Sequence, residues 1–285
     1  MKSKKLKKWT TLLTCATALT VMTACSQSSS QSTGTTSSTT SKTSAVTVTT
    51  SKKTNKNNSN YFTSKDSDTS YNESSATKIK LSGSSADVSG DGAALSGSTV
   101  TISKAGTYVI SGKSDGVQIK VDAGDSDDVH IVLDGVTMTN TNAAINATKA
   151  GHVYLTLKDG TTNTLSDSSS NSDEDADAVI FSKGDLTING SGTLNIDAKK
   201  NNGIKANDSL HMTGGTYKIS SVGDAFNVND ELNITGTTMT IEAEEDAVKV
   251  NNDDDTSAGT MYLSDNTMTI KAGDDGIVRQ IHGTC

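Results

Sequence analysis

From Thr77 onward the chain consists of short runs in which apolar and polar residues alternate. Examples are "TVTIS", "TYVIS", "VYLTLKDG" and "LTINGSGTLNI", separated by Gly, Asn and Asp. Alternation with a period of two predicts strands of four to six residues, because successive side chains of a strand point to opposite faces. No stretch shows helical periodicity, and the chain contains no proline. The pattern predicts an all-β fold.

A repeat runs through the second half of these strands. "DAFNV" at residues 224–228 returns as "DAVKV" at residues 246–250, and from residue 177 the equivalent anchor positions are 25, 22, 22 and 29 residues apart. The anchors are Asp177, Asn202, Asp224, Asp246 and Asp275, with earlier ones placed at Asp91, Asp115 and Ala143. After the anchors from Asn202 onward, apolar pairs recur in register, for example Leu210 with Met212 and Leu232 with Ile234.

Each unit of about 22 residues thus holds three short strands and no helix. Such a unit cannot bury its own apolar face, whereas stacked units can, which is the logic of a solenoid. The repeat therefore predicts a parallel β-helix over residues 77–285. A β-sandwich is the main alternative, and the register of consecutive units argues against it.

Stacking would bring the anchor carboxylates together. Equivalent residues of adjacent coils lie about 4.8 Å apart, so Asp224, Asp246 and Asp275 would form a column. Glu245 and Asp274 add negative charge beside it. Either each Asp accepts hydrogen bonds from turn amides, or neighbouring carboxylates share a hard cation, for which Ca²⁺ is the best candidate. The five acidic residues are the predicted metal ligands.

A second ladder is predicted three residues after the anchors, at Lys205, Asn227 and Lys249. These side chains should point outward, because their neighbours carry the inward alternation. Lysines and an amide beside bound Ca²⁺ would suit an acidic sugar chain, so the three are candidate ligand-binding residues. The alternative is a solvated strand face on which the lysines balance the aspartates.

The N-terminus has the layout of a secretory signal. Five lysines precede an apolar run, and "VMTAC" at residues 21–25 resembles a bacterial lipobox, in which Cys25 is acylated. We expect a signal peptide over residues 1–24 and a lipid anchor on the extracellular face of the bacterial cell membrane. Residues 25–76 are rich in Ser, Thr and Asn and are predicted to be a disordered tether.

Charge and cysteine content narrow the function classes. Without residues 1–24 the 25 basic residues become 20 against 33 acidic ones, so the net charge moves from −8 to −13. Nucleic acid is therefore excluded as an expected partner, since phosphate binding needs a cationic face. Of three cysteines, Cys15 lies in the signal and Cys25 is the lipidation site, which leaves Cys285 alone and predicts no disulfide.

Several runs resemble a known family. "GTYVISGKSDG", "VHIVLDGVTMTNTNAAI", "LTINGSGTLNI" and "NGIKANDSL" are similar to the bacterial carbohydrate-binding β-helix family, which is related in shape to pectate lyases. The resemblance covers about residues 78–277. It implies a right-handed parallel β-helix, binding of cellulose or acidic plant polysaccharide, and calcium at acidic turn positions that correspond to Asp224, Asp246 and Asp275.

We therefore expect a polysaccharide-binding surface lipoprotein. A calcium-dependent lyase is an alternative and would need Lys249 or Lys205 as its base; a structural adhesin and an ice-binding protein are others. The four histidines, His130, His152, His211 and His282, are scattered in the sequence and match no catalytic motif. After Asp275 a coil begins and ends within ten residues, which suggests a truncated β-helix, or else a tail that folds back over the last coil.

Overall fold

The computed structural model describes residues 45–50, 58–252, 255 and 257–281. All of them belong to the unit Lys42–Cys285. They form 24 strands and two short 3-10 helices, η1 (Asn58–Asn60) and η2 (Lys65–Ser67). No helix among the described residues is long and apolar enough to cross a membrane. The predicted signal peptide and lipidation site at Cys25 lie outside the described residues.

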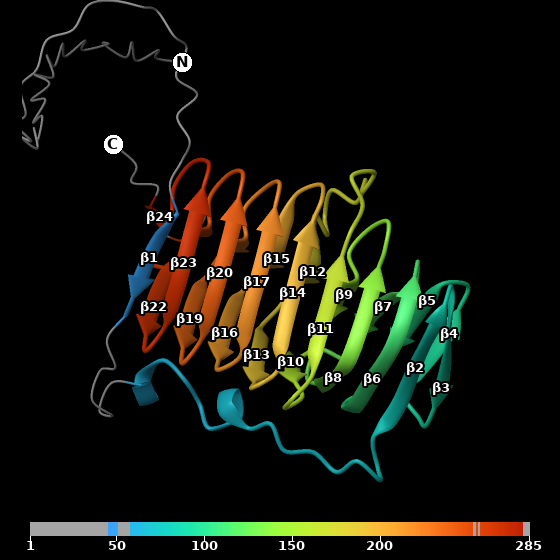
Figure 1. Ribbon diagram of the computed structural model, residues 1–285. Helices are drawn as coiled ribbons and strands as arrows, with labels where there is room; N and C mark the ends of the chain where they lie inside the picture. Colours follow the sequence, from blue (N-terminus) through green and yellow to red (C-terminus); the bar gives the residue numbers. More distant parts are fainter. Residues whose placement is uncertain (1–44, 51–57, 253–254, 256, 282–285) are drawn as a thin grey trace, which may run out of the picture. The chain divides into compact units, whose positions relative to one another are not determined.

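Most strands pair in parallel with the strand one coil further along the chain, and this produces three ladders (Figure 1). The first ladder contains β6 (Gly106–Asp115), β8 (Asp128–Thr139), β10 (His152–Leu157), β13 (Leu186–Gly190), β16 (Ser209–Thr213), β19 (Glu231–Thr235) and β22 (Thr260–Ser264). The second ladder begins at the far half of β8 and continues through β11 (Thr162–Ser166), β14 (Thr193–Ala198), β17 (Thr216–Ser221), β20 (Thr238–Ala243) and β23 (Thr267–Ala272).

The third ladder contains β5 (Thr99–Ile102), β7 (Gln118–Asp122), β9 (Ile145–Lys149), β12 (Ala178–Ser182), β15 (Asn202–Ala206), β18 (Phe226–Val228), β21 (Val248–Asn252) and β24 (Val278–Ile281). The described part of the chain is thus all-β, with the parallel sheets of a β-helix-like fold. No α-helix interrupts the described coils.

The core is built from inward-facing residues that stack on their equivalents. On the second ladder, Ile196, Ile219, Ile241 and Ile270 form one such column, and each is at most 5% exposed. Branched aliphatic side chains favour the strand conformation and fill the interior of successive coils in the same way. The period-two alternation seen in the sequence is therefore the alternation between this core and the outer faces.

The pairing register corrects some of the predicted anchors. Asn202, Asp224, Asp246 and Asp275 are equivalent positions, because Ile204, Phe226 and Val248 follow in register. In the preceding coil Ala178, and not Asp177, pairs with Asn202. The predicted anchor is off by one residue because the last aspartate of the acidic loop before β12, Asp177, lies one position before the anchor position. Ala143 is correctly placed two residues before Ile145, whereas Asp115 and Asp91 are not equivalent positions.

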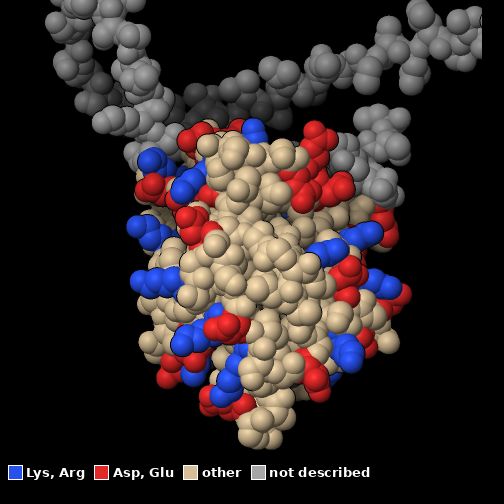
Figure 2. All heavy atoms as spheres, turned by 90° about the vertical axis from the view of Figure 1, so that its right-hand side faces the viewer, with Lys and Arg blue, Asp and Glu red and all other residues tan. Residues whose placement is uncertain are grey.

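Hairpins close the first end of the coils. β3 (Ser85–Ser89) pairs antiparallel with β2 (Thr77–Gly83), and β4 (Ala93–Ser96) pairs antiparallel with β5. Val88, Ala93 and Leu95 pack against the core there. Figure 2 shows this end of the molecule, with uncharged residues in the centre and charged side chains around the rim. The hairpins thus shield the apolar interior that an open first coil would expose.

A segment from before the coils closes the last one. β1 (Val46–Thr49) pairs antiparallel with β23, so that Val46 lies opposite Ile270 (Figure 1). Thr50 extends the pairing, because its hydroxyl accepts a hydrogen bond from the Asn266 amide at 2.9 Å. Sequence analysis expected a truncated β-helix or a tail that folds back over the last coil, and it did not anticipate a partner strand from the predicted tether.

The described part of the predicted tether is structured. We call residues 61–70 the strap; it runs beneath the first ladder from the β22 end toward β8 (Figure 1). Asp66 is 2% exposed, which no disordered residue would be. The prediction of disorder over 25–76 is wrong for this stretch, because hydrogen bonds to the sheet replace the apolar contacts that its composition lacks.

Candidate functional site

The anchor positions form a column in which side chains bind the main chain of the next coil. The Asp224 amide donates to Asn202 Oδ1 at 3.0 Å, and the Asp246 amide donates to Asp224 Oδ1 at 3.0 Å. The Asp275 amide donates to Asp246 Oδ1 at 2.9 Å. Each buried carboxylate therefore stabilises the turn that follows one coil later.

The residues predicted as the outward ladder neutralise this column. Lys205, Asn227 and Lys249 pair with one another across the coils. Lys249 Nζ lies 3.5 Å from Asp224 Oδ2 and 3.6 Å from Asp246 Oδ2, while Asn227 donates to Asp224 Oδ2 at 2.7 Å. Lys205 Nζ bonds Asp177 Oδ1 at 2.7 Å. These side chains hold carboxylates rather than an open ligand surface.

Electrostatics keep Lys249 charged. Burial alone would lower the pKa of Lys249, but the carboxylates of Asp224 and Asp246 outweigh it and hold the pKa above its ordinary value. A general base must be unprotonated when it acts, so a raised pKa works against that role. The geometry makes Lys249 a counter-ion of the column.

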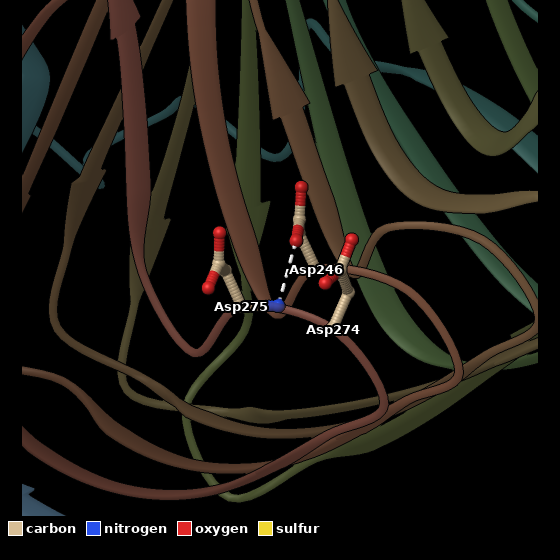
Figure 3. A group of neighbouring side chains, drawn as sticks. All are labelled: Asp246, Asp274 and Asp275. Carbon is tan, nitrogen blue, oxygen red and sulfur yellow. Dashed lines mark hydrogen bonds between the residues drawn. The ribbon is translucent and has the colours of Figure 1, made fainter. Parts of the chain in front are cut away.

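The last coil holds an acidic group. One carboxylate oxygen from each of Asp246, Asp274 and Asp275 lies within 4.8 Å of the others, with Asp246 buried and the other two exposed (Figure 3). Among the described residues, no ion pair involves Asp274 or Asp275. Three oxygen ligands at one point fit a hard cation such as Ca²⁺. Of the predicted ligands, Glu245 and Asp224 are not part of this group.

A second candidate site lies on the outward surface of β8, β10, β13, β16, β19 and β22, which we call the histidine face. Its central row, one residue from each strand, is His130, Tyr154, Thr187, His211, Asn233 and Tyr262. His152 lies beside this row on β10. The structure thus brings together three histidines that sequence analysis treated as scattered.

Hydrogen bonds link the side chains of this face across the coils. His130 Nε2 lies 2.7 Å from the Thr156 hydroxyl, which donates to Asn189 Oδ1 at 2.6 Å. His152 Nε2 lies 2.9 Å from the Thr187 hydroxyl, and its ring stacks on Tyr154 with centroids 4.1 Å apart. Burial lowers the pKa of His130 and of His152, so both rings are neutral at pH 7.

Asp66 fixes the strap to this face. Its Oδ1 accepts from the Thr187 hydroxyl at 2.7 Å and lies 3.2 Å from His211 Nδ1. Its Oδ2 accepts from the Thr63 amide at 2.6 Å. The main-chain oxygen of Asp66 also accepts from Asn189 and Thr213.

Aromatic contacts fix the other end of the strap. Tyr61 stacks on Tyr262 with ring centroids 3.7 Å apart, and the Asn233 amide donates to the Tyr61 carbonyl at 2.9 Å. Phe62 meets His211 edge-on. The strap therefore contacts the face both through its polar centre and through these rings.

The contact between Asp66 and His211 shifts the pKa of each group toward its charged form. Burial alone would raise the pKa of Asp66, but hydrogen bonds from His211, Thr187 and Thr63 hold it far below its ordinary range. Burial alone would lower the pKa of His211, but Asp66 and Glu231, the latter 2.9 Å from Nε2, raise it. The strap is therefore held by a charged Asp66 beside a His211 whose charged form the two carboxylates stabilise.

Sequence reasoning missed this face for a specific reason. His130 and His152 lie on coils before Asp177, where the sequence repeat is loose, so the three histidines could not be aligned to one face. The one available signal was register, since Asn233 and Tyr262 follow His211 at the same point of the next coils. The strap carries no repeat, and distant partners, such as Thr187 for Asp66 and Asn233 for Tyr61, 121 and 172 residues away, could not be assigned.

Comparison with known proteins identifies the family. A family model described as "carbohydrate-binding domain-containing protein" matches residues 96–282, which include most of the coils. The chain belongs to this family. A member from Acetivibrio thermocellus is 37% identical over 137 residues, which are 46% of this chain and 48% of that protein. The chain thus matches about half the length of that curated relative.

A solved structure supports the same placement. It is titled "polysaccharide lyase-like protein from C. thermocellum", a gadolinium derivative, and the two folds superpose with a TM-score of 0.67. The match covers 71% of this chain and 93% of that chain at 28% identity. The family and the parallel β-rich fold that the sequence resemblance implied are confirmed.

The strap contact should depend on pH. His211 has a raised pKa in the folded protein, so its contribution to stability is full below its unfolded pKa of about 6.5 and is lost as the pH rises through the folded value. We expect His211→Gln to lower the free energy of unfolding by about 1 kcal/mol at pH 6 and by less at pH 9. Urea unfolding at both pH values measures the difference.

His130→Gln is the matched control. The pKa of His130 is lowered in the folded protein, so this histidine destabilises the fold as the pH falls below about 6.5. Relative to wild type, His130→Gln should therefore be more stable at low pH than at high pH, opposite to His211→Gln. If His211→Gln costs as much at pH 9 as at pH 6, the ionic contact with Asp66 and Glu231 does not hold the strap.

Proposed function

We propose that the protein is a surface lipoprotein that binds polysaccharide through a calcium-stabilised β-helix. On this proposal the fold is a right-handed parallel β-helix with three strands per coil, and the extracellular face of the bacterial cell membrane is its location. The observation that carries the proposal is the family match over residues 96–282. A rigid face with rows of hydroxyl, amide and imidazole groups at the coil spacing is well suited to sugar hydroxyls.

Binding is favoured over catalysis. The related structure carries the words "polysaccharide lyase-like" in its title, so a calcium-dependent lyase is the second candidate. Such a lyase needs a base that can lose its proton, whereas Lys205 and Lys249 are both paired with carboxylates. A non-catalytic adhesin would share the fold, but unlike the proposed binding protein it would bind no soluble glycan.

Calcium is proposed at Asp246, Asp274 and Asp275. These carboxylates come together where the anchor column ends, and the exposed pair gains no lysine among the described residues. Bound Ca²⁺ would supply the positive charge that Lys249 supplies one coil earlier. The related structure is a gadolinium derivative; a lanthanide, like calcium, is a hard cation that prefers oxygen ligands, which is consistent with this proposal.

The anchor is proposed at Cys25. With a lipid there and β1 held on β23 from Val46 onward, the proposed tether is the stretch between Cys25 and Val46 rather than the whole of 25–76. The strongly acidic composition still excludes nucleic acid as an expected partner.

The proposed function predicts retention on polysaccharide. The chain from residue 26, which lacks the lipidated Cys25, should be retained on insoluble cellulose or cross-linked pectin and pass through a column of plain agarose. Incubation with polygalacturonate and Ca²⁺ should give no rise in the absorbance of unsaturated product. Failure to bind any polysaccharide would refute the proposal, and accumulating product would establish the lyase instead.

Calcium should raise the thermal midpoint. A ligand that binds the folded state alone stabilises it by about 2.7 kcal/mol at 100 times its Kd, on the order of 5–10 °C for a domain of this size. Asp274→Asn should reduce this gain, while Asp87→Asn, on β3 at the opposite end, should leave it intact. If chelator does not change the thermal midpoint, the calcium proposal fails, and the carboxylates of the column serve only as hydrogen-bond acceptors.

Cys25→Ala should release the protein from the membrane. Without the acylated thiol the chain either stays unprocessed or appears in the medium, and immunoblots of membrane and medium fractions distinguish the two. Cys15→Ala, inside the signal, is the matched control and should remain membrane-bound. A processed Cys25→Ala chain that still fractionates with membranes would contradict lipidation.

A further inference from the structure

Two hollows lie between the strap and the histidine face, one on each side of Tyr154. The larger, of about 280 Å³, is lined by Thr63, His152, Asp185 and Glu231 among others. The smaller, of about 180 Å³, is lined by Lys65, Asp128 and His130 among others. Because Tyr154 borders both, the hollows are neighbours along the flank of the strap, and we refer to the two together as the groove.

We propose that this groove binds an uncharged hexose chain, with sugar rings packed against the wall formed by His152 and Tyr154. The inference rests on the proposed function and names where the sugar binds and which class of sugar it is. Neither Lys205 nor Lys249, which the sequence favoured as ligand-binding residues, takes part.

The wall has the chemistry of a sugar platform. The rings of His152 and Tyr154 are half-buried and stack face to face, 14° from parallel, so each covers one face of the other. The outer face of Tyr154, where Lys65 Nζ lies 5.8 Å from the ring centroid, is the face that a sugar can pack against once Lys65 is displaced. Aromatic side chains offer an apolar face together with a polar edge, which matches the C–H faces and hydroxyl rim of a pyranose. Since burial lowers the pKa of His152, the wall is uncharged at neutral pH.

The charges of the groove select against acidic sugars. The two hollows are lined by five carboxylates but by only two basic groups, Lys65 and His211; the five are Asp66, Asp68, Asp128, Asp185 and Glu231. Carboxylates accept hydrogen bonds from sugar hydroxyls, whereas a uronate would meet like charges at short range. Asp185 is well placed for this, because within the described residues its carboxylate accepts one hydrogen bond, from the Ser209 amide at 3.2 Å.

The groove runs in a suitable direction. Its lining extends from β8 to β19, across coils that are about 4.8 Å apart. A 1,4-linked hexose chain laid along the coil axis would therefore meet a different side chain of the central row at each coil. The Lys65–Asp128 ion pair crosses this path at 2.7 Å, and both side chains are largely exposed. Exposed pairs contribute little, so a sugar can displace this one at small cost.

Affinity gel electrophoresis tests the proposal, with hydroxyethyl cellulose as the uncharged probe and polygalacturonate as the acidic one. Wild-type protein should be retarded by hydroxyethyl cellulose at lower concentration than by polygalacturonate. Tyr154→Ala should weaken the retardation by hydroxyethyl cellulose about tenfold, while Tyr154→Phe, which keeps the ring, should stay close to wild type. Lys218→Ala, exposed on the second ladder, is the matched control and should change nothing.

Two further variants test the charge and the strap. Asp185→Asn removes a negative charge with little change in shape and should bring the affinity for polygalacturonate closer to that for hydroxyethyl cellulose. Asp66→Ala removes the contact that fixes one wall and should weaken binding of hydroxyethyl cellulose. If Asp66→Ala binds more tightly than wild type, the strap competes with sugar for the face and the groove is not the site.

The remaining outcomes separate this inference from the function on which it rests. If wild type is retarded by hydroxyethyl cellulose and Tyr154→Ala is retarded equally, sugar binds elsewhere and the proposed function stands. A stronger retardation by polygalacturonate than by hydroxyethyl cellulose overturns the choice of an uncharged sugar. Retardation by neither polymer, with no retention on cellulose or pectin, refutes both proposals. Because Tyr154 lies on an outer face, unchanged thermal midpoints should confirm that the two Tyr154 variants are folded.

Discussion

The hydrogen-bond spacing between parallel strands dictates most of this structure. It places every residue about 4.8 Å from its equivalent in the next coil, so that residues of the same type lie next to one another along each column. For isoleucine, as in Ile196, Ile219 and Ile241, this is an advantage, because identical shapes stack into a continuous core. For aspartate it is a cost, because two carboxylates at this distance repel by about 3–4 kcal/mol at an effective dielectric of 20.

The chain manages that cost by giving each carboxylate two tasks. One oxygen of Asp224 holds the amide of Asp246, and the other faces Asn227 and Lys249. The column is thereby hydrogen-bonded along its length and neutralised from the side. Beside Asp274 and Asp275 no lysine of the described residues takes the place that Lys249 has in the coil before, although the carboxylates continue. The calcium proposal therefore concerns the last coil rather than the whole column. The same constraint orders the histidine face, where imidazole, amide and hydroxyl groups bond across coils instead of repelling.

How far the sequence could predict these features depends on whether they repeat. The strands, the anchor register from Asn202 onward and the outward direction of Lys205 and Lys249 follow from local alternation and a constant period. The partners of those lysines could not be predicted, because the repeat period alone cannot show that the side chain of Lys249 turns back toward Asp224. The strap was beyond reach for a stronger reason. Its residues are polar, so composition suggested disorder, and what orders Asp66 is a set of bonds to distant strands.

The return of the N-terminal segment to the last coil sets the order in which the molecule can assemble. Coils can add one after another, since each needs only its predecessor as a template. β1 has no template until β23 exists, and the hydroxyls of Thr47 and Thr269, which meet at 3.3 Å, are 222 residues apart in the chain. Contacts of such separation form late, because the loop between them must close first. The strap follows the same rule at Tyr61, whose partner Tyr262 lies on the last strand of its ladder. During synthesis the strap can therefore cover the histidine face only step by step, as the coils that carry its partners from Asp128 to Tyr262 form, and β1 can pair only after β23.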